Sequence, residues 1–238
     1  MNKIQIIPDK FKICSGSTLK LIAVVTMLID HIAAHLMTEK TVTFAVGGIT
    51  LSLYVIMRRI GRVAFPLFVF LLTEGFVHTH NRLKYGGSLL VCAIVSEFPW
   101  DLIHSGQLIY KGQNVFFTLL LGFLGMCAAE MWGDKHLIPL LALVGLAVLS
   151  VVAEADYGLN GYVFIILMYA LRENELFRPF TAFLFGRCWY VMAAFIPIML
   201  YNGKRGFIRG PVLKYAFYAF YPVHLFILYL FEYRIISF

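Results

Sequence analysis

The segment Leu19–Met37 reads LKLIAVVTMLIDHIAAHLM, an apolar run long enough to cross a membrane as a helix. Near its end the run carries Asp30, His31 and His35, although an ionisable group in hydrocarbon costs about 3 kcal/mol or more. Such groups usually face a bundle interior or an aqueous cavity, on a substrate or proton path. The segment therefore predicts a transmembrane helix with a functional site at one end.

Further apolar runs follow along the whole chain. Hydrophobic residues make up 61% of the sequence and charged residues 14%, and the mean hydropathy is +0.81, which excludes an ordinary soluble domain. We predict an all-α, polytopic integral membrane helical bundle of about eight transmembrane helices, with seven to nine allowed. Residues 1–238 would form a single transmembrane domain in the inner, or cytoplasmic, membrane of the cell. The expected spans are Leu19–Met37, Val63–Val77, Gly86–Ile103, Val115–Met131, Leu137–Val152, Leu159–Ala170, Phe180–Tyr201 and Tyr215–Phe231.

Two features leave the topology open. The apolar stretch Phe44–Met57 contains Gly47–Gly48 and is short for a span, so it predicts an interfacial or re-entrant helix that could make a ninth crossing. In an eight-span arrangement, lysines and arginines divide almost equally between the two sides, with Arg187 inside the seventh span. Their distribution therefore does not set the orientation.

Charge and cysteine content exclude other classes of function. The formal charge of +7 could suggest nucleic acid, but the basic residues lie mostly in loops and at span ends, where a lipid bilayer places them. We predict the bilayer as a partner and no nucleic acid. The four cysteines lack the spacing of a disulfide framework or a zinc site, and we expect no metal.

The end of the first span offers a base. His31 and His35 are one helical turn apart and share a face, whereas Asp30 is rotated by about 100° from His31 and must find another partner. The functional interpretation makes His31 a general base, with a carboxylate orienting its other nitrogen. The alternatives are a hydrated pair at a helix end, or a metal site, for which the sequence identifies no third ligand.

Three arginines precede the second span. Arg58 and Arg62 are one turn apart and Arg59 adds a third guanidinium, so the group could fork onto phosphate oxygens at the mouth of a bundle. Gly61 permits close helix approach, and Pro66 bends the span, as is common where a cavity is built. The alternative is that these arginines extend from the membrane edge to water.

The third span closes with two carboxylates. Glu97 and Asp101 share a helix face if Pro99 does not break the helix, and such a pair could hold a proton or orient an imidazole. The alternative places both in water beside an interfacial Trp100. Asn114 is a candidate for the binding set, although its position before Val115–Met131 is also that of a helix N-cap.

The last span contains a second intramembrane imidazole. His224 follows Tyr221 and Pro222 in an otherwise apolar run, and it predicts either a cavity-lining group or a buried histidine bonded to a neighbouring helix. The acidic connection that contains Asp156 and Tyr157 favours a solvated turn over a site.

Several ordered motifs resemble the TraX family of membrane proteins, whose best-known activity is N-acetylation of pilin subunits. They are Leu19–Ala23 with Thr26–His31, Arg59–Phe68 with Glu74–Phe76, Ser96–Pro99, Gln113–Thr118 and Tyr221–Leu225. The resemblance covers nearly the whole chain. It departs from the family pattern at Ala33, where glycine is expected, and at the additional His35.

The family is similar in outline to broader transmembrane acyltransferases, which transfer an acyl group from a coenzyme A thioester and use an intramembrane histidine. This resemblance implies acetyl-CoA as donor, a pilin-like protein or surface glycan as acceptor, and His31 as the leading catalytic residue. The full candidate set is Asp30, His31, Glu97, Asp101 and His224 for catalysis, with Arg58, Arg59, Arg62 and Asn114 for the coenzyme. A small permease or proton-coupled carrier, and a non-catalytic assembly factor, are the alternatives.

Overall fold

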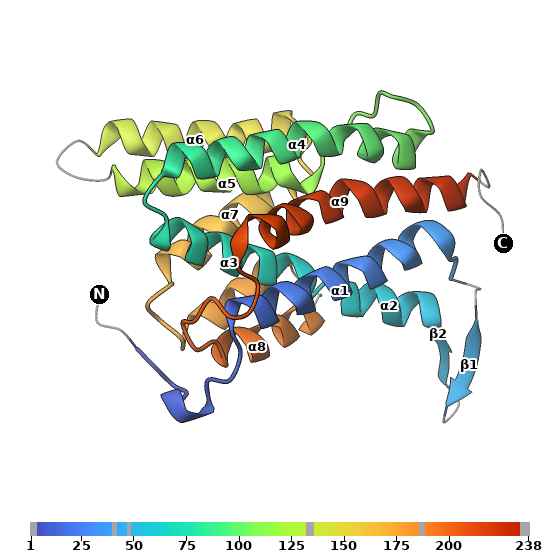
Figure 1. Ribbon diagram of the computed structural model, residues 1–238, viewed down its shortest axis with the longest axis horizontal. Helices are drawn as coiled ribbons and strands as arrows, with labels where there is room; N and C mark the ends of the chain where they lie inside the picture. The colour runs from blue at the N-terminus through green and yellow to red at the C-terminus, as the bar shows by residue number, and fades with distance from the viewer. Residues whose placement is uncertain (1–3, 40–41, 47–48, 132–135, 186–188, 234–238) are drawn as a thin grey trace.

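The computed structural model describes residues 4–39, 42–46, 49–131, 136–185 and 189–233, and Figure 1 shows most of its helices running along the long axis of the molecule. The helices are α1 (Gly16–Leu36), α2 (Leu53–Gly61), α3 (Ala64–His78), α4 (Arg82–Ser105), α5 (Val115–Glu130), α6 (Leu137–Val152), α7 (Gly158–Ala170), α8 (Phe195–Met199) and α9 (Gly210–Glu232). The prediction of a largely helical chain is confirmed.

Several of these helices are long and apolar enough to cross a membrane. They are α1, α4 and the stretch Leu53–His78, in which α2 and α3 follow each other closely. Shorter apolar helices include α5, α6 and α7. The chain is therefore a multi-pass membrane protein.

Polar side chains set where the helices begin. The Ser15 hydroxyl accepts from the Thr18 amide at the start of α1, and Asn81 and Asn114 cap α4 and α5 in the same way. The capping role considered for Asn114 is thus observed. Helix α4 continues through Pro99, so Glu97 and Asp101 do lie on one continuous helix.

The prediction of a helix over Phe44–Met57 holds only from Leu53 onward and is wrong for the residues before it. Strands β1 (Thr43–Val46) and β2 (Ile49–Ser52) form an antiparallel hairpin, and α2 begins directly afterwards at Leu53. A short apolar run does not distinguish a strand from a helix, and the β-branched residues of this stretch favour the strand.

The predicted span Phe180–Tyr201 is also wrong. Its described part consists of two 3-10 helices, η2 (Arg178–Phe185) and η3 (Trp189–Ala194), followed by the short α8, and we call these three elements the re-entrant segment. The flanking residues Asn174 and Tyr201 both pair with the N-terminal segment, so the chain enters and leaves at the same end of the bundle. A continuous α-helix is disfavoured here because Pro197 lacks an amide hydrogen and would clash with the preceding turn. Arg187 lies outside the described residues.

A clip of extended chain closes this end. The Ile4 amide donates to the Glu173 carbonyl at 2.9 Å, and the Cys14 amide donates to the Leu200 carbonyl at 2.9 Å. Between them, Lys12 Nζ lies 2.5 Å from Glu175 Oε1. We call residues 4–14, with their partners at 173–175 and 200–202, the N-terminal clip, which ties the start of the chain to both sides of the re-entrant segment.

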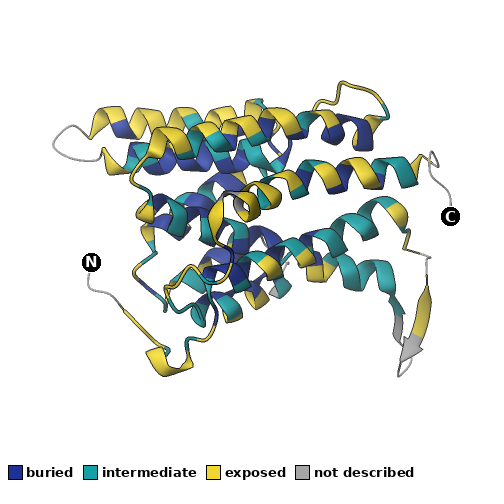
Figure 2. Cartoon of the chain, in the orientation of Figure 1, coloured by how far each residue is buried: buried dark blue, intermediate teal, exposed yellow. Residues whose placement is uncertain are grey.

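The opposite end of the bundle, which we call the histidine end, gathers the last turns of α1, α4 and α9. His35 of α1 contacts Glu232 of α9, and Gly106 after α4 lies against Tyr233. A small core of apolar residues that includes Met27, Trp100 and Leu225 packs just beneath it. Figure 2 shows the buried surface concentrated between the inner helices, while α6 at the edge is largely exposed along its length.

Candidate functional site

Two histidines from opposite ends of the sequence meet at the histidine end. Nδ1 of His31 on α1 lies 2.6 Å from Nε2 of His224 on α9, and the two ring planes are within 7° of each other. This is a hydrogen bond between two imidazoles, and it joins two of the residues predicted to be catalytic.

The next hydrogen bond in the chain assigns the tautomers of both rings. Nδ1 of His224 lies 2.8 Å from the carbonyl oxygen of Phe220, and because a carbonyl can only accept, this nitrogen carries the hydrogen. In a neutral His224, Nε2 is then an acceptor, so the hydrogen between the rings belongs to Nδ1 of His31. The remaining nitrogen, Nε2 of His31, is left with a free lone pair. No hydrogen bond within the described residues occupies it.

Two further histidines extend this pair toward the end of the bundle. The ring centroids of His35 and His31 are 6.3 Å apart, and those of His35 and His104, on α4, are 5.4 Å apart. Nδ1 of His35 donates to Glu232 at 3.2 Å, and Nδ1 of His104 donates to the Trp100 carbonyl at 2.9 Å. His104 was not among the predicted site residues, because it comes near His35 only when α1 and α4 are packed together.

Asp30 finds its partner on α2. Its Oδ2 lies 2.8 Å from the guanidinium of Arg58, which also contacts the Asp30 backbone carbonyl at 3.3 Å. Arg62 lies close enough to Asp30 for electrostatic attraction, and its side chain makes a hydrogen bond with Tyr157. Gly61 brings the two helices together, since a Cβ there would overlap the Asp30 side chain. Asp30 therefore holds arginines in place and does not orient the neighbouring imidazole.

The predicted arginine cluster is split by this arrangement. Arg58 and Arg62 both face Asp30, whereas Arg59 is exposed and lies over the ring of Tyr190, 5.9 Å from its centroid. Within the described residues, Arg58 makes an ion pair with a carboxylate and Arg62 makes a hydrogen bond with Tyr157, whereas Arg59 makes neither kind of contact and is exposed.

The carboxylates of α4 lie on a different side of the site. Glu97 accepts from the side chain of Asn114, whose amide also donates to the Ala93 carbonyl at 2.9 Å. Asp101 is 8% exposed, and the imidazole within electrostatic range of its carboxylate is that of His104. The structure thus pairs Glu97 with the α5 N-cap and places Asp101 one turn closer to the end of the bundle.

Several buried polar atoms at this end lack a hydrogen-bond partner among the described residues. They are Asp30 Oδ1, Ser96 Oγ, Glu97 Oε1, Asp101 Oδ1 and Tyr221 Oη. An unpaired buried polar atom is costly, and its persistence often marks a site that a ligand or water completes.

Asp156 lies beside this region, in an exposed turn between α6 and α7, as its sequence favoured. Its amide donates to the Gln113 carbonyl at 2.9 Å, which ties the α6–α7 connection to the start of α5. The surrounding protein raises the pKa of Asp156 to about 6, with nearby Arg62 opposing the shift and Asp30 adding to it. A carboxyl with such a pKa gains and loses its proton near neutrality.

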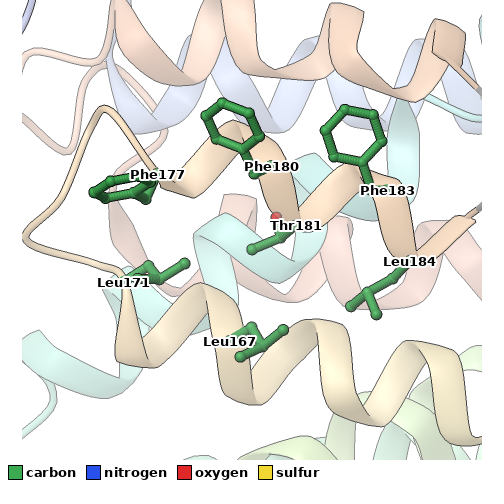
Figure 3. A pocket seen from close by; sticks show the side chains of 7 residues that line it. All are labelled: Leu167, Leu171, Phe177, Phe180, Thr181, Phe183 and Leu184. Carbon is green, nitrogen blue, oxygen red and sulfur yellow. The ribbon is translucent and has the colours of Figure 1, made fainter.

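An open hollow elsewhere carries no such chemistry. It has a volume of about 510 Å³ and lies between α7 and the re-entrant segment. Figure 3 shows that phenylalanine and leucine side chains line it, and its one polar group, the Thr181 hydroxyl, donates to the Arg178 carbonyl at 2.7 Å. The hollow contains no titratable side chain, so the histidine end is the candidate site.

One family model and one curated relative match most of the chain. The family described as TraX protein matches residues 15–232. A curated relative, "Probable fimbrial assembly protein FimC, serogroup H1" of Dichelobacter nodosus, is 29% identical over 241 residues, which cover 89% of this chain and 93% of the relative. No solved structure shows a significant match.

Proposed function

Because the chain belongs to the TraX protein family, we propose that it is a membrane-embedded acyltransferase, which moves an acetyl group from acetyl-CoA to an amine or hydroxyl of its acceptor. The fimbrial role in the name of its relative supports a pilin-like protein as the acceptor, with a surface glycan as the other candidate. The observation that carries the proposal is the hydrogen-bond chain from Phe220 through His224 to His31. It supports a general base on a fixed tautomer inside the bundle.

In the proposed reaction, Nε2 of His31 takes the proton from the acceptor nitrogen or oxygen as that atom bonds to the thioester carbon. The carbon–sulfur bond then breaks, and the departing coenzyme thiolate takes the same proton back from Nε2. His224 is a positioning residue. By accepting from Nδ1 of His31, it keeps Nε2 free in the neutral ring and stabilises the imidazolium that forms.

The charged groups around the pair have distinct proposed roles. Exposed Arg59 is the best candidate to hold a coenzyme phosphate, since Arg58 and Arg62 already contact Asp30 or Tyr157. The latter two would then keep α1 and α2 in register around the site. Glu97, held by Asn114, could set the proton state of the acceptor. A thioester held inside a bundle is shielded from water and is transferred in preference to being hydrolysed.

The test compares acceptor mass in cells that make the wild-type chain, the His31→Ala variant or no chain. Mass spectrometry of surface proteins and glycans should find one added acetyl group only with the wild type, because His31→Ala removes the base. With the acceptor identified and acetyl-CoA as donor, purified His224→Leu should lose about 100-fold in kcat and keep its KM, since the base remains but is no longer oriented.

The matched control is His78→Ala. This exposed histidine on α3 also bonds to a carbonyl four residues earlier, but at the other end of the bundle, so its loss should leave acetylation unchanged. Full activity of His31→Ala would remove that residue from the chemistry. If no acceptor gains mass, while proteoliposomes containing the chain take up solute without an acyl donor, the protein is a carrier and the proposal is wrong.

A further inference from the structure

Tyr221 carries a buried hydroxyl, its ring contacts both members of the histidine pair, and the proposed reaction gives it no role. Its side chain is 4% exposed, and its Oη atom has no hydrogen-bond partner among the described residues. The ring contacts His31 edge-on at 6.2 Å between centroids and His224 at 5.6 Å. An apolar ring would fill this space equally well, so the hydroxyl is not needed for packing.

The hydroxyl lies at the start of a helix. Val115, in the first turn of α5, packs against the apolar cluster that contains Tyr221. The first amides of a helix have no partner within it and concentrate partial positive charge. Positive charge beside the phenol makes its hydrogen a stronger donor, and the start of α5 supplies that charge.

Neighbouring rings hold the Tyr221 ring in one orientation. The Phe116 ring packs edge-on against it at 5.2 Å between centroids, and the side-chain oxygen of Asn114 holds the first turn of α5 by accepting from the Phe116 amide at 3.0 Å. Since Tyr221 and His224 are one turn apart on α9, the hydroxyl and the residue that positions the base come from adjoining positions of one helix.

We propose that Tyr221 is a catalytic residue whose hydroxyl donates to the thioester oxygen as that oxygen becomes negative, and this role rests on the acyltransferase function proposed above. When the acceptor atom bonds to the carbonyl carbon, the electron pair of the C=O bond moves to the oxygen. The Tyr221 O–H stabilises that charge, while Nε2 of His31 takes the acceptor's proton. As the carbon–sulfur bond breaks, the pair returns to the C=O bond and Tyr221 keeps its own proton. The phenol is therefore unchanged after each turnover.

The experiment is the Tyr221→Phe substitution, which removes one oxygen atom and keeps the ring. We expect kcat for acetyl transfer to fall about 100-fold or more, as when other oxyanion donors are removed, with the KM for acetyl-CoA unchanged. The thermal unfolding midpoint should stay level or rise, because the variant no longer buries an unpaired hydroxyl. The rate is followed by release of the coenzyme thiol in the presence of the acceptor identified by mass spectrometry.

The matched control is Tyr229→Phe, which removes a hydroxyl from the same helix about two turns beyond Tyr221 and should leave kcat unchanged. Wild-type kcat in Tyr221→Phe, with His31→Ala inactive, would overturn the role of Tyr221 and leave the proposed function standing. A fall in kcat together with a lower unfolding midpoint would also overturn it, since that result describes a packing role. A wild-type chain that transfers no acyl group would overturn both.

Discussion

The N-terminal clip and the histidine end handle buried polar groups in opposite ways. In the clip, the Lys12 and Glu175 side chains are 9% and 12% exposed, and they contact each other at 2.5 Å. The other Glu175 oxygen accepts from the Ile6 amide at 2.8 Å and from the Ile7 amide at 3.3 Å. At the histidine end, oxygens of several acidic residues and Tyr221 remain unpaired. Groups that satisfy one another stabilise the fold, whereas groups left unpaired are available to a substrate.

The largest expected effect on stability comes from breaking the clip. Glu175→Ala leaves the Lys12 ammonium largely buried without its close partner, because Asp9 is 3.9 Å away and mostly exposed. We expect a loss of about 3 kcal/mol in the free energy of unfolding. Thermal unfolding in detergent measures it. The kcat of the protein that remains folded should not change, and a lower kcat at an unchanged unfolding midpoint would contradict the division between the two ends.

A smaller effect should follow where the histidine end depends on close helix approach. Gly61→Ala places a methyl group on the Asp30 side chain, so α1 and α2 must separate and the contact between Asp30 and Arg58 must loosen. We expect a loss of about 1–3 kcal/mol in stability, together with reduced acetyl transfer. The control is Gly145→Ala on α6, where a Cβ meets nothing within 4 Å and both measurements should stay near wild type. Equal behaviour of the two variants would show that the approach at Gly61 does not matter.

The smallest effect is the acid sensitivity of the clip. Burial raises the pKa of Glu175, but hydrogen bonds from Lys12 and from the Ile6 and Ile7 amides outweigh it and hold the pKa below its usual value. The stabilisation is therefore present above the pKa of an unfolded glutamate, about 4.3, and is lost as the pH falls through the lower folded value. The unfolding midpoint should decline below about pH 4. Glu175→Gln should be less stable at neutral pH and decline less steeply in acid, and an identical acid decline in both proteins would show that Glu175 is not responsible.

Most of the helical architecture could be predicted from hydropathy, because a long apolar run must form its backbone hydrogen bonds internally. For example, the helix predicted over Leu137–Val152 has the same bounds as α6. The hairpin after α1 and the re-entrant segment could not be predicted in this way. Hydropathy measures the transfer of a stretch into lipid and does not report whether the chain continues straight or turns back.

Parts of the candidate site could also be predicted from the sequence, and other parts could not. That Asp30 must turn away from His31 follows from helix geometry alone, and its partner proved to be Arg58. The contact between His31 and His224 joins residues 193 positions apart, and no local pattern encodes a pairing at that separation. The sequence places Tyr221 in an apolar run, within the motif Tyr221–Leu225, but it does not reveal an unpaired hydroxyl, which is a property of the packed structure.

The re-entrant segment has a consequence for sidedness. Because the chain turns back at Arg178–Met199, Gly16 and Glu232 lie at opposite ends of the bundle, and the N-terminal clip shares its end with the basic loop 204–209. Cytoplasmic loops are enriched in lysine and arginine. The near-equal division of these residues was expected for eight spans; with the seventh span replaced by the re-entrant segment, the basic loop favours a cytosolic clip and an outward-facing half of the bilayer for the paired imidazoles. An acceptor assembled outside the cell would then meet the base without entering the cytosol.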